Sequence, residues 1–194
     1  AYICAMVLNL GNKIGNREDF AKDCAFEPTY LPKNMSLDEI SKENLLDVKA
    51  AVLSYGGYDF YKYALQNAET YKNIFWWLAL AKPRGVLGEE FNPIDHPELY
   101  KAISPIYNIP EASERELPPQ LLTAATRDRI TPVHMIEEYG SALQEKNQEF
   151  EFWEHLGRNH AYLDSGRTLI AGNDFVRDGI PALKVMMNFF DKHL

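Results

Sequence analysis

Two apolar runs in the C-terminal half of the chain each lead into a residue that can orient or move a proton. The first run, Leu121 to Ala125, is followed by Asp128 in the turn ATRDRITP. The second run, Phe150 to His155, is followed by His160 in the loop LGRNH. The 32 positions between the acid and the histidine leave room for one helix and one strand. Strands joined by a helix run parallel and end at the same edge of a sheet, where open α/β sheets place their sites. The spacing therefore predicts that the two side chains meet at that edge.

The other apolar segments indicate the fold class. We expect an apolar helix from Ala1 to Leu10 that is buried on all sides, and a buried parallel strand from Val48 to Tyr55. Further helices are predicted at Thr70–Leu80, Pro97–Ala102, Pro132–Lys146 and Ile180–Leu194. Alternation of strands and helices is typical of the α/β class, with a mostly parallel sheet and crossover helices.

Composition limits the partners of the chain. Its 194 residues carry a formal charge of −8, which argues against nucleic acid and against an anionic membrane surface as the main partner. With 46% hydrophobic and 25% charged residues, the chain is expected to fold and not to be disordered. No apolar run reaches the ~18 residues of a membrane span, so no membrane span is predicted.

The cysteines and the first residues bear on the compartment. Cys4 and Cys24 lie in no metal-binding pattern and are expected to be reduced thiols in the core, with a disulfide between them left open. The opening AYICAMVLNL has neither a basic start nor a Met and does not resemble a signal peptide. We therefore expect a cytoplasmic protein, and a chain that begins inside a longer one.

Asp128 and His160 fit two of the three roles in a serine hydrolase. Such an enzyme needs a nucleophile, a histidine that carries the proton, and an acid that fixes the histidine tautomer. Each residue alone also has a structural interpretation, because an Asp in this kind of turn often caps a helix and a loop His is often only solvated. His155 is expected to pack beside the site. No pair of histidines has a metal-ligand spacing, so no metal is predicted.

The chain resembles the C-terminal part of an α/β-hydrolase of the carboxylesterase and acetyl-esterase type, related to hormone-sensitive-lipase-like enzymes. Asp128 in ATRDRITP and His160 in GRNHAYLDSG carry the resemblance, with Ala161-Tyr162 where the family has Gly-Phe. AVLSYGGYDF is similar to the strand that follows the nucleophile, and DHPELYKAISPIYNI to the segment that lines the pocket. The resemblance covers nearly the whole chain.

The resemblance implies that residues 1–194 are the C-terminal part of one α/β-hydrolase domain with a helical cap insertion at about 58–115. It also implies that the N-terminal strands, the oxyanion loop and the G-x-S-x-G nucleophile elbow lie before Ala1. Ser54 in LSYGG is a rival nucleophile, but Val52 occupies the first glycine position of that motif. Ser54 is more simply the end of a buried strand, and Ser104 a turn residue.

The implied function is that of a carboxylic-ester hydrolase without metal or organic cofactor. His160 would act as general base and then as general acid, and Asp128 would orient it. The substrate would be a small-molecule ester, with Trp76, Trp77 and Tyr107 as candidate residues of an apolar pocket. A homo-oligomer is left open. Two alternatives stay open as well: a serine peptidase of the prolyl-oligopeptidase type, and a non-catalytic binding protein on the same fold.

Overall fold

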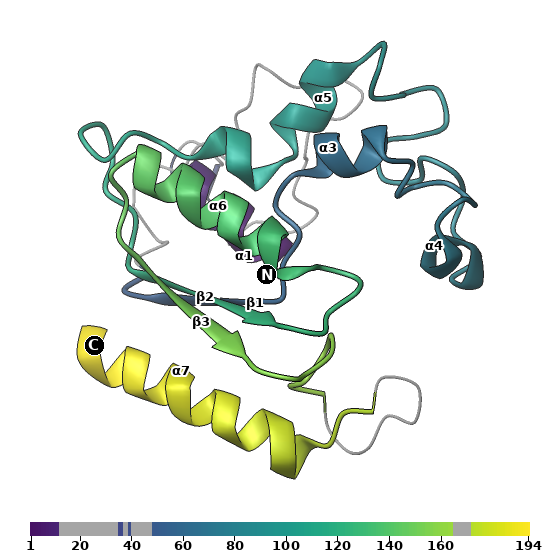
Figure 1. Ribbon diagram of the computed structural model, residues 1–194. Helices are drawn as coiled ribbons and strands as arrows, with labels where there is room; N and C mark the ends of the chain where they lie inside the picture. The colour runs from purple at the N-terminus through teal and green to yellow at the C-terminus, as the bar shows by residue number, and fades with distance from the viewer. Residues whose placement is uncertain (12–34, 37–38, 40–47, 165–171) are drawn as a thin grey trace. The chain divides into compact units, whose positions relative to one another are not determined.

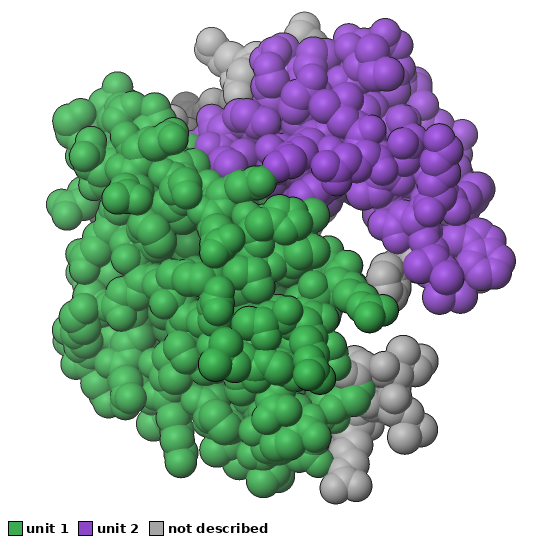
Figure 2. Space-filling view, viewed as in Figure 1, with its two compact units in different colours: residues 1–9, 47–58, 109–194 green, residues 10–46, 59–108 purple. Residues whose placement is uncertain are grey.

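The computed structural model describes residues 1–11, 35, 36, 39, 48–164 and 172–194. The chain divides into two compact units (Figure 2). Residues 1–9, 47–58 and 109–194 form unit 1, and residues 10–46 and 59–108 form unit 2. Unit 2 contains most of the predicted insertion, and its role as a cap stays a prediction.

Unit 1 is built on a parallel sheet of three strands in the order β1-β2-β3. The strands are β1 (Ala51–Ser54), β2 (Gln120–Ala125) and β3 (Phe150–His155). Ser54 pairs with Thr123, and Thr123 pairs with Trp153, so the three strands run in register toward one edge. The predicted parallel sheet with crossover helices is confirmed.

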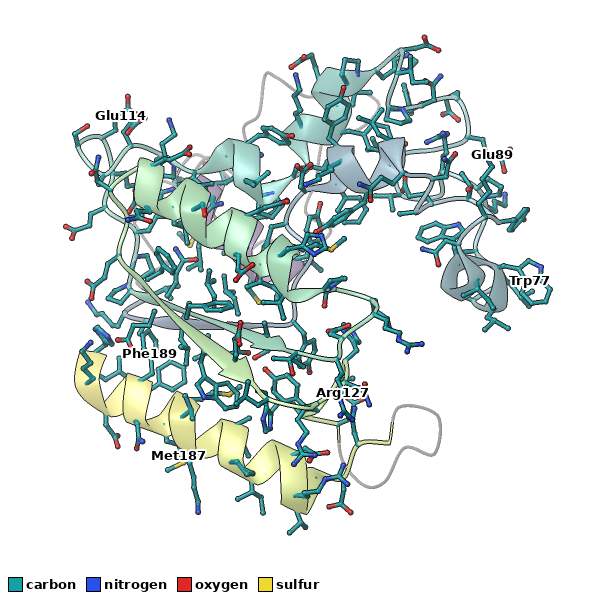
Figure 3. All side chains as sticks on the ribbon, viewed as in Figure 1. Trp77, Glu89, Glu114, Arg127, Met187 and Phe189 are labelled. Atoms are coloured by element: carbon teal, nitrogen blue, oxygen red, sulfur yellow. The ribbon has the colours of Figure 1, made fainter. Side chains whose placement is uncertain are left out.

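Helices cover both faces of this sheet (Figure 1). Helix α6 (Val133–Glu145) lies on one face and helix α7 (Ile180–His193) on the other. All six residues of β2 are buried, as expected for a central strand covered on both sides. On the α7 face, Leu121 and Ala125 pack with Met186 and Phe189. Figure 3 shows Phe189 turned toward the strands, whereas Met187 projects from the opposite side of α7 and is exposed.

Helix α1 (Tyr2–Leu10) packs through one face only, which corrects the prediction that it is buried on all sides. Asn9 accepts a hydrogen bond from the Tyr139 hydroxyl of α6 (3.2 Å). Arg115 donates to the carbonyl of Leu8 near the end of the helix (3.0 Å). On the other side, Ile3 is 71% exposed.

The cysteine prediction is also corrected in part. Cys4 is a free thiol on the exposed side of α1 and does not lie in the core. Cys24 lies outside the described residues.

Several elements are shorter than their sequence patterns. β1 starts three residues later than predicted and ends at Ser54, because Tyr55 takes a left-handed conformation (φ 40°). In the predicted helix 70–80, only α4 (Ile74–Leu78) is helical, and Leu80 is left-handed (φ 52°). A π-helical turn, Phe175–Gly179, leads into α7 and was not predicted.

Within residues 59–108, unit 2 consists mainly of short helices. They are α3 (Phe60–Leu65), α4, α5 (Pro97–Ala102) and the 3-10 turn η3 (Pro105–Asn108). The Ser104 hydroxyl joins α3 to α5, since it accepts from the backbone N–H of Tyr61 (3.2 Å) and donates to the carbonyl of Tyr100 (2.7 Å). In neither unit does a helix among the described residues have the length and apolar character that crossing a bilayer demands.

Gly140 marks the closest approach of α6 to the sheet. A Cβ atom at this position would lie 2.8 Å from Cε2 of Phe150 and 3.5 Å from Cδ1 of Leu122. We predict that Gly140→Ala lowers the free energy of unfolding by about 1–2 kcal/mol, because the steric cost exceeds the gain in helix propensity of about 1 kcal/mol. Urea denaturation measures the difference.

Ser141→Ala is the matched control on the exposed side of the same helix and should change stability by no more than about 0.5 kcal/mol. A Gly140→Ala protein as stable as the native chain would show that α6 does not pack this closely.

Candidate active site

Asp128 is fixed by the turn that follows β2. Its backbone N–H donates to the carbonyl of Ala125 (3.0 Å). Its Oδ1 atom accepts from the backbone N–H groups of Ile130 (2.8 Å) and Thr131 (2.9 Å). Pro132, with its φ of −55°, then starts α6. The carboxylate therefore closes the turn, and its second oxygen is left to face the site.

The loop that carries His160 is hydrogen-bonded to the Asp128 turn. The backbone N–H of Gly157 donates to the Thr126 hydroxyl (2.7 Å), and the backbone N–H of Arg127 donates to the carbonyl of Arg158 (2.8 Å). Figure 3 labels Arg127 at this edge of the sheet. These two hydrogen bonds hold the loops next to each other, so the acid and the histidine lie close together at the edge of the sheet.

The side chains of Asp128 and His160 form the predicted hydrogen bond. Nδ1 of His160 lies 2.7 Å from Oδ2 of Asp128. The Asp128 side chain has no exposed surface, whereas that of His160 is 26% exposed. Burial by itself would raise the pKa of Asp128, but the hydrogen bonds from His160 and from the backbone of Thr131 and Ile130 hold it below its ordinary value.

The protonation of the pair follows from this geometry. An ionised carboxylate only accepts hydrogen bonds, so we assign the proton of a neutral His160 to Nδ1. Nε2 then carries the lone pair, and it belongs to a side chain that is open in part to solvent. A histidine in this state can take a proton at Nε2, while the adjacent carboxylate stabilises the resulting charge.

Two further residues that contact the imidazole ring of His160 were missed by the sequence analysis. The ring of Tyr55 lies edge-on to the imidazole, with 5.0 Å between the ring centroids. The hydroxyl of Thr131 lies 3.2 Å from Nδ1 of His160. The end of an apolar run at Tyr55 could have indicated its position at the same sheet edge, but no pattern around Thr131 indicates where its hydroxyl points.

The three predicted pocket residues lie in unit 2 and are not brought together. Trp76 donates its indole N–H to the carbonyl of Lys82 (2.8 Å), and Trp77 is 54% exposed on the outer side of α4 (Figure 3). Tyr107 is 48% exposed and donates to Asp59 (3.1 Å). It lines a pocket of about 310 Å³ whose other lining residues are Glu98, Lys101, Ala102 and Asn108. A role in substrate binding stays a prediction for all three.

A fully buried carboxylate, Asp178, supports the histidine loop from the other side. Arg158, two residues before His160, forms an ion pair with it (2.9 Å). The hydrogen bonds from Arg177 are the main reason that the pKa of Asp178 falls from 3.8 to about 2, against the opposing effect of burial. His155 is buried at the end of β3, with its Nε2 2.8 Å from the carbonyl of Asp178.

The structure is similar to several solved structures, although no family model and no curated protein sequence matches the chain. The apo form of esterase 2 from Thermogutta terrifontis is 18% identical, with a TM-score of 0.50 over 83% of this chain and 46% of its own. The acylaminoacyl peptidase of Pyrococcus horikoshii is 17% identical, with a TM-score of 0.49 over 75% of this chain and 20% of its own. A truncated carbohydrate esterase from gut microbiota is 19% identical, with a TM-score of 0.41 over 58% of this chain and 35% of its own.

The chain thus spans less than half the length of each of these proteins. At such low identity the likeness concerns the fold alone, and it confirms the predicted fold class: an α/β-hydrolase fold with a parallel sheet and flanking helices. Within the described ranges, no three His, Cys, Asp or Glu side chains gather in an arrangement suited to a metal ion.

Ala161, directly after His160, has a left-handed backbone (φ 61°) that favours glycine. An L-residue pays roughly 1–2 kcal/mol for this conformation, and the greater freedom of glycine in the unfolded chain offsets part of the gain. We predict that Ala161→Gly raises the free energy of unfolding by about 0.5–1 kcal/mol. Chemical denaturation tests this, and Ala142→Gly within α6 should have the opposite sign, with a loss of about 1 kcal/mol.

Asp178 should make the stability of unit 1 depend on pH in acid. Its pKa of about 2 in the folded chain lies below its ordinary 3.8, so its contribution is complete above pH about 4 and is lost as the pH falls toward about 2. We predict that Asp178→Asn lowers the free energy of unfolding by about 1–3 kcal/mol at pH 7, and that this difference shrinks between pH about 4 and about 2. A difference that is constant over this range would contradict the assignment.

Proposed function

We propose that this chain supplies the base and the acid of a serine hydrolase that acts on carboxylic esters. The observation that carries the proposal is the 2.7 Å hydrogen bond between His160 Nδ1 and the buried, ionised Asp128. If His160 were only a solvated loop residue, we would not expect it to hydrogen-bond to a carboxylate that has no exposed surface. If Asp128 only formed the turn, we would not expect its second oxygen to bind the histidine. Both residues follow strands of a sheet that has the α/β-hydrolase fold, which supports the same interpretation.

Each step of the proposed reaction assigns one task to each residue. Nε2 of His160 accepts the proton of a serine hydroxyl while the serine oxygen attacks the ester carbonyl carbon. The imidazolium then returns that proton to the departing alcohol, which leaves an acyl-enzyme. In the second half His160 takes a proton from a water molecule whose oxygen attacks the acyl carbon. The bond from that carbon to the serine oxygen then breaks, the carboxylic acid leaves, and the imidazolium returns the proton to the serine oxygen. Asp128 stays ionised throughout, in keeping with a pKa held below its ordinary value.

The nucleophile is proposed to lie upstream of Ala1 in a longer protein. The 194 residues contain no G-x-S-x-G motif. Ser54 is half-buried at the end of β1, where its side chain hydrogen-bonds to Tyr162. Ser104 is fully buried, and both of its hydrogen bonds serve to join α3 to α5. Neither of these two serines is arranged as a nucleophile, which supports the proposal that the nucleophile lies upstream.

The choice of an ester over a peptide substrate rests on the resemblance of the Asp128 and His160 segments to the carboxylesterase and acetyl-esterase group. We assign substrate contacts to unit 2, acting as a cap, because Trp77 and Tyr107 present large aromatic surfaces that the unit itself does not bury. Exposed aromatic side chains of this kind suit an apolar acyl or aromatic group.

Hydrolysis of p-nitrophenyl acetate tests the proposal. The purified 194-residue chain should show no turnover above the uncatalysed rate, and the longer protein with its upstream residues should be active. In the longer protein, His160→Ala and Asp128→Asn should each lower kcat by about 10³-fold or more, because the triad works as a unit. His134→Ala, an exposed histidine at the start of α6, is the control and should retain the native rate.

Two results would overturn the proposal. Turnover by the longer protein that survives His160→Ala would remove this histidine from the reaction. Cleavage of a peptide p-nitroanilide with no hydrolysis of the acetate ester would replace the esterase with a serine peptidase.

A further inference from the structure

We propose that Thr131 is a positioning residue for His160. The hydroxyl of Thr131 holds the Asp128–His160 pair at the end of β1. The meaning of this role for catalysis rests on the proposed function, but the contact itself can be tested without any reaction. Asp128 reaches His160 through a single hydrogen bond, about which the imidazole ring can still rock. A second polar contact at the same nitrogen would restrict that motion.

The hydroxyl of Thr131 lies at the centre of three polar atoms from separate segments. Its oxygen is 2.9 Å from Oδ2 of Asp128, 3.2 Å from Nδ1 of His160 and 3.1 Å from the carbonyl oxygen of Tyr55. The acid turn, the histidine loop and the end of β1 therefore meet at one side chain. All four residues belong to unit 1.

The number of protons on these atoms determines which hydrogen bonds the Thr131 hydroxyl can donate and accept. The Nδ1 proton of His160 goes first to Oδ2 of Asp128, which is the nearest acceptor at 2.7 Å. The single proton of Thr131 alternates between Oδ2 of Asp128 and the carbonyl of Tyr55, and it links the pair to β1 when it is donated to Tyr55. In both cases the Thr131 oxygen keeps a lone pair for the Nδ1–H group of His160. The hydroxyl thus supplies a second acceptor that favours the tautomer a general base requires.

The backbone and the side chain of Thr131 are themselves restricted, so its hydroxyl has a defined position. Its backbone N–H donates to Oδ1 of Asp128 (2.9 Å). The residue precedes Pro132, which restricts its backbone, and its β-branched side chain has few rotamers. The hydroxyl is therefore placed before any substrate arrives, at little further cost in side-chain entropy.

Tyr55, at the end of β1, is the residue to which the Thr131 hydroxyl links the Asp128–His160 pair. Its left-handed backbone (φ 40°) is uncommon for a residue other than glycine, and it follows directly on β1. Its carbonyl faces the Thr131 hydroxyl, while its ring packs edge-on against His160 (5.0 Å). One residue thus contacts His160 both directly and through Thr131, which explains why an unfavourable backbone conformation is tolerated at this position.

The test compares Thr131→Val and Thr131→Ser with the native 194-residue chain by NMR of ¹⁵N-labelled histidine. Valine keeps the shape of threonine and removes the hydroxyl, whereas serine keeps the hydroxyl. The native chain and Thr131→Ser should show a His160 Nδ1–H resonance with slow exchange against solvent. In Thr131→Val that exchange should be at least about tenfold faster, since a tenfold change corresponds to the 1.4 kcal/mol of an ordinary hydrogen bond.

Thermal unfolding and the backbone amide spectrum show whether each variant is folded, so that a loss of structure is not mistaken for a loss of the contact. The proposal is overturned if Thr131→Val exchanges at the native rate, or if Thr131→Ser behaves like Thr131→Val. Neither result depends on hydrolysis. A longer protein that fails to cleave esters would therefore refute the proposed function and leave the role of Thr131 standing.

Discussion

The carboxylate of Asp128 is the constraint on which the site depends. A charge without solvent exposure is costly unless hydrogen bonds replace the water it has lost. Here Oδ1 receives two backbone N–H groups, and Oδ2 faces His160 and the Thr131 hydroxyl. Three of these four contacts come from the turn itself, and the fourth, from His160, contributes most to holding the pKa of the buried acid below its ordinary value. His160 then meets a negative charge that is already fixed in position.

The parallel sheet makes this meeting possible. Thr123 of β2 pairs with Trp153 of β3, and the loops beyond the two strands are joined by backbone hydrogen bonds. Asp178 adds a second support through its ion pair with Arg158. The histidine loop is thus held by the acid turn on one side and by the residues before α7 on the other. This leaves the imidazole as the part of the site that is exposed.

The sequence predicted the features that follow from periodicity. The runs that became β2 and β3 are apolar, bounded by turns and separated by a clear helix, so their order and common edge could be inferred. The positions of Tyr55 and Thr131 could not, because they depend on the pairing of Ser54 with Thr123 and on a side-chain rotamer. The exposed side of α1 was missed because an apolar sequence does not show how many faces of the helix pack against other elements. The sequence shows that Ala161 stands where the family that the chain resembles has Gly, but only the φ of Ala161 shows why glycine would suit that position.

Among the described strands, β1 has a neighbour on one side only, since it pairs with β2 and lies at the end of the strand order. The outward backbone groups of such a strand form a template onto which any extended polypeptide can align. Lys, Pro and β-bulges are the usual protections of a sheet margin, and the four residues AVLS of β1 contain no Lys or Pro. Within the described strands, this margin is therefore the place where a further extended segment could pair with the sheet.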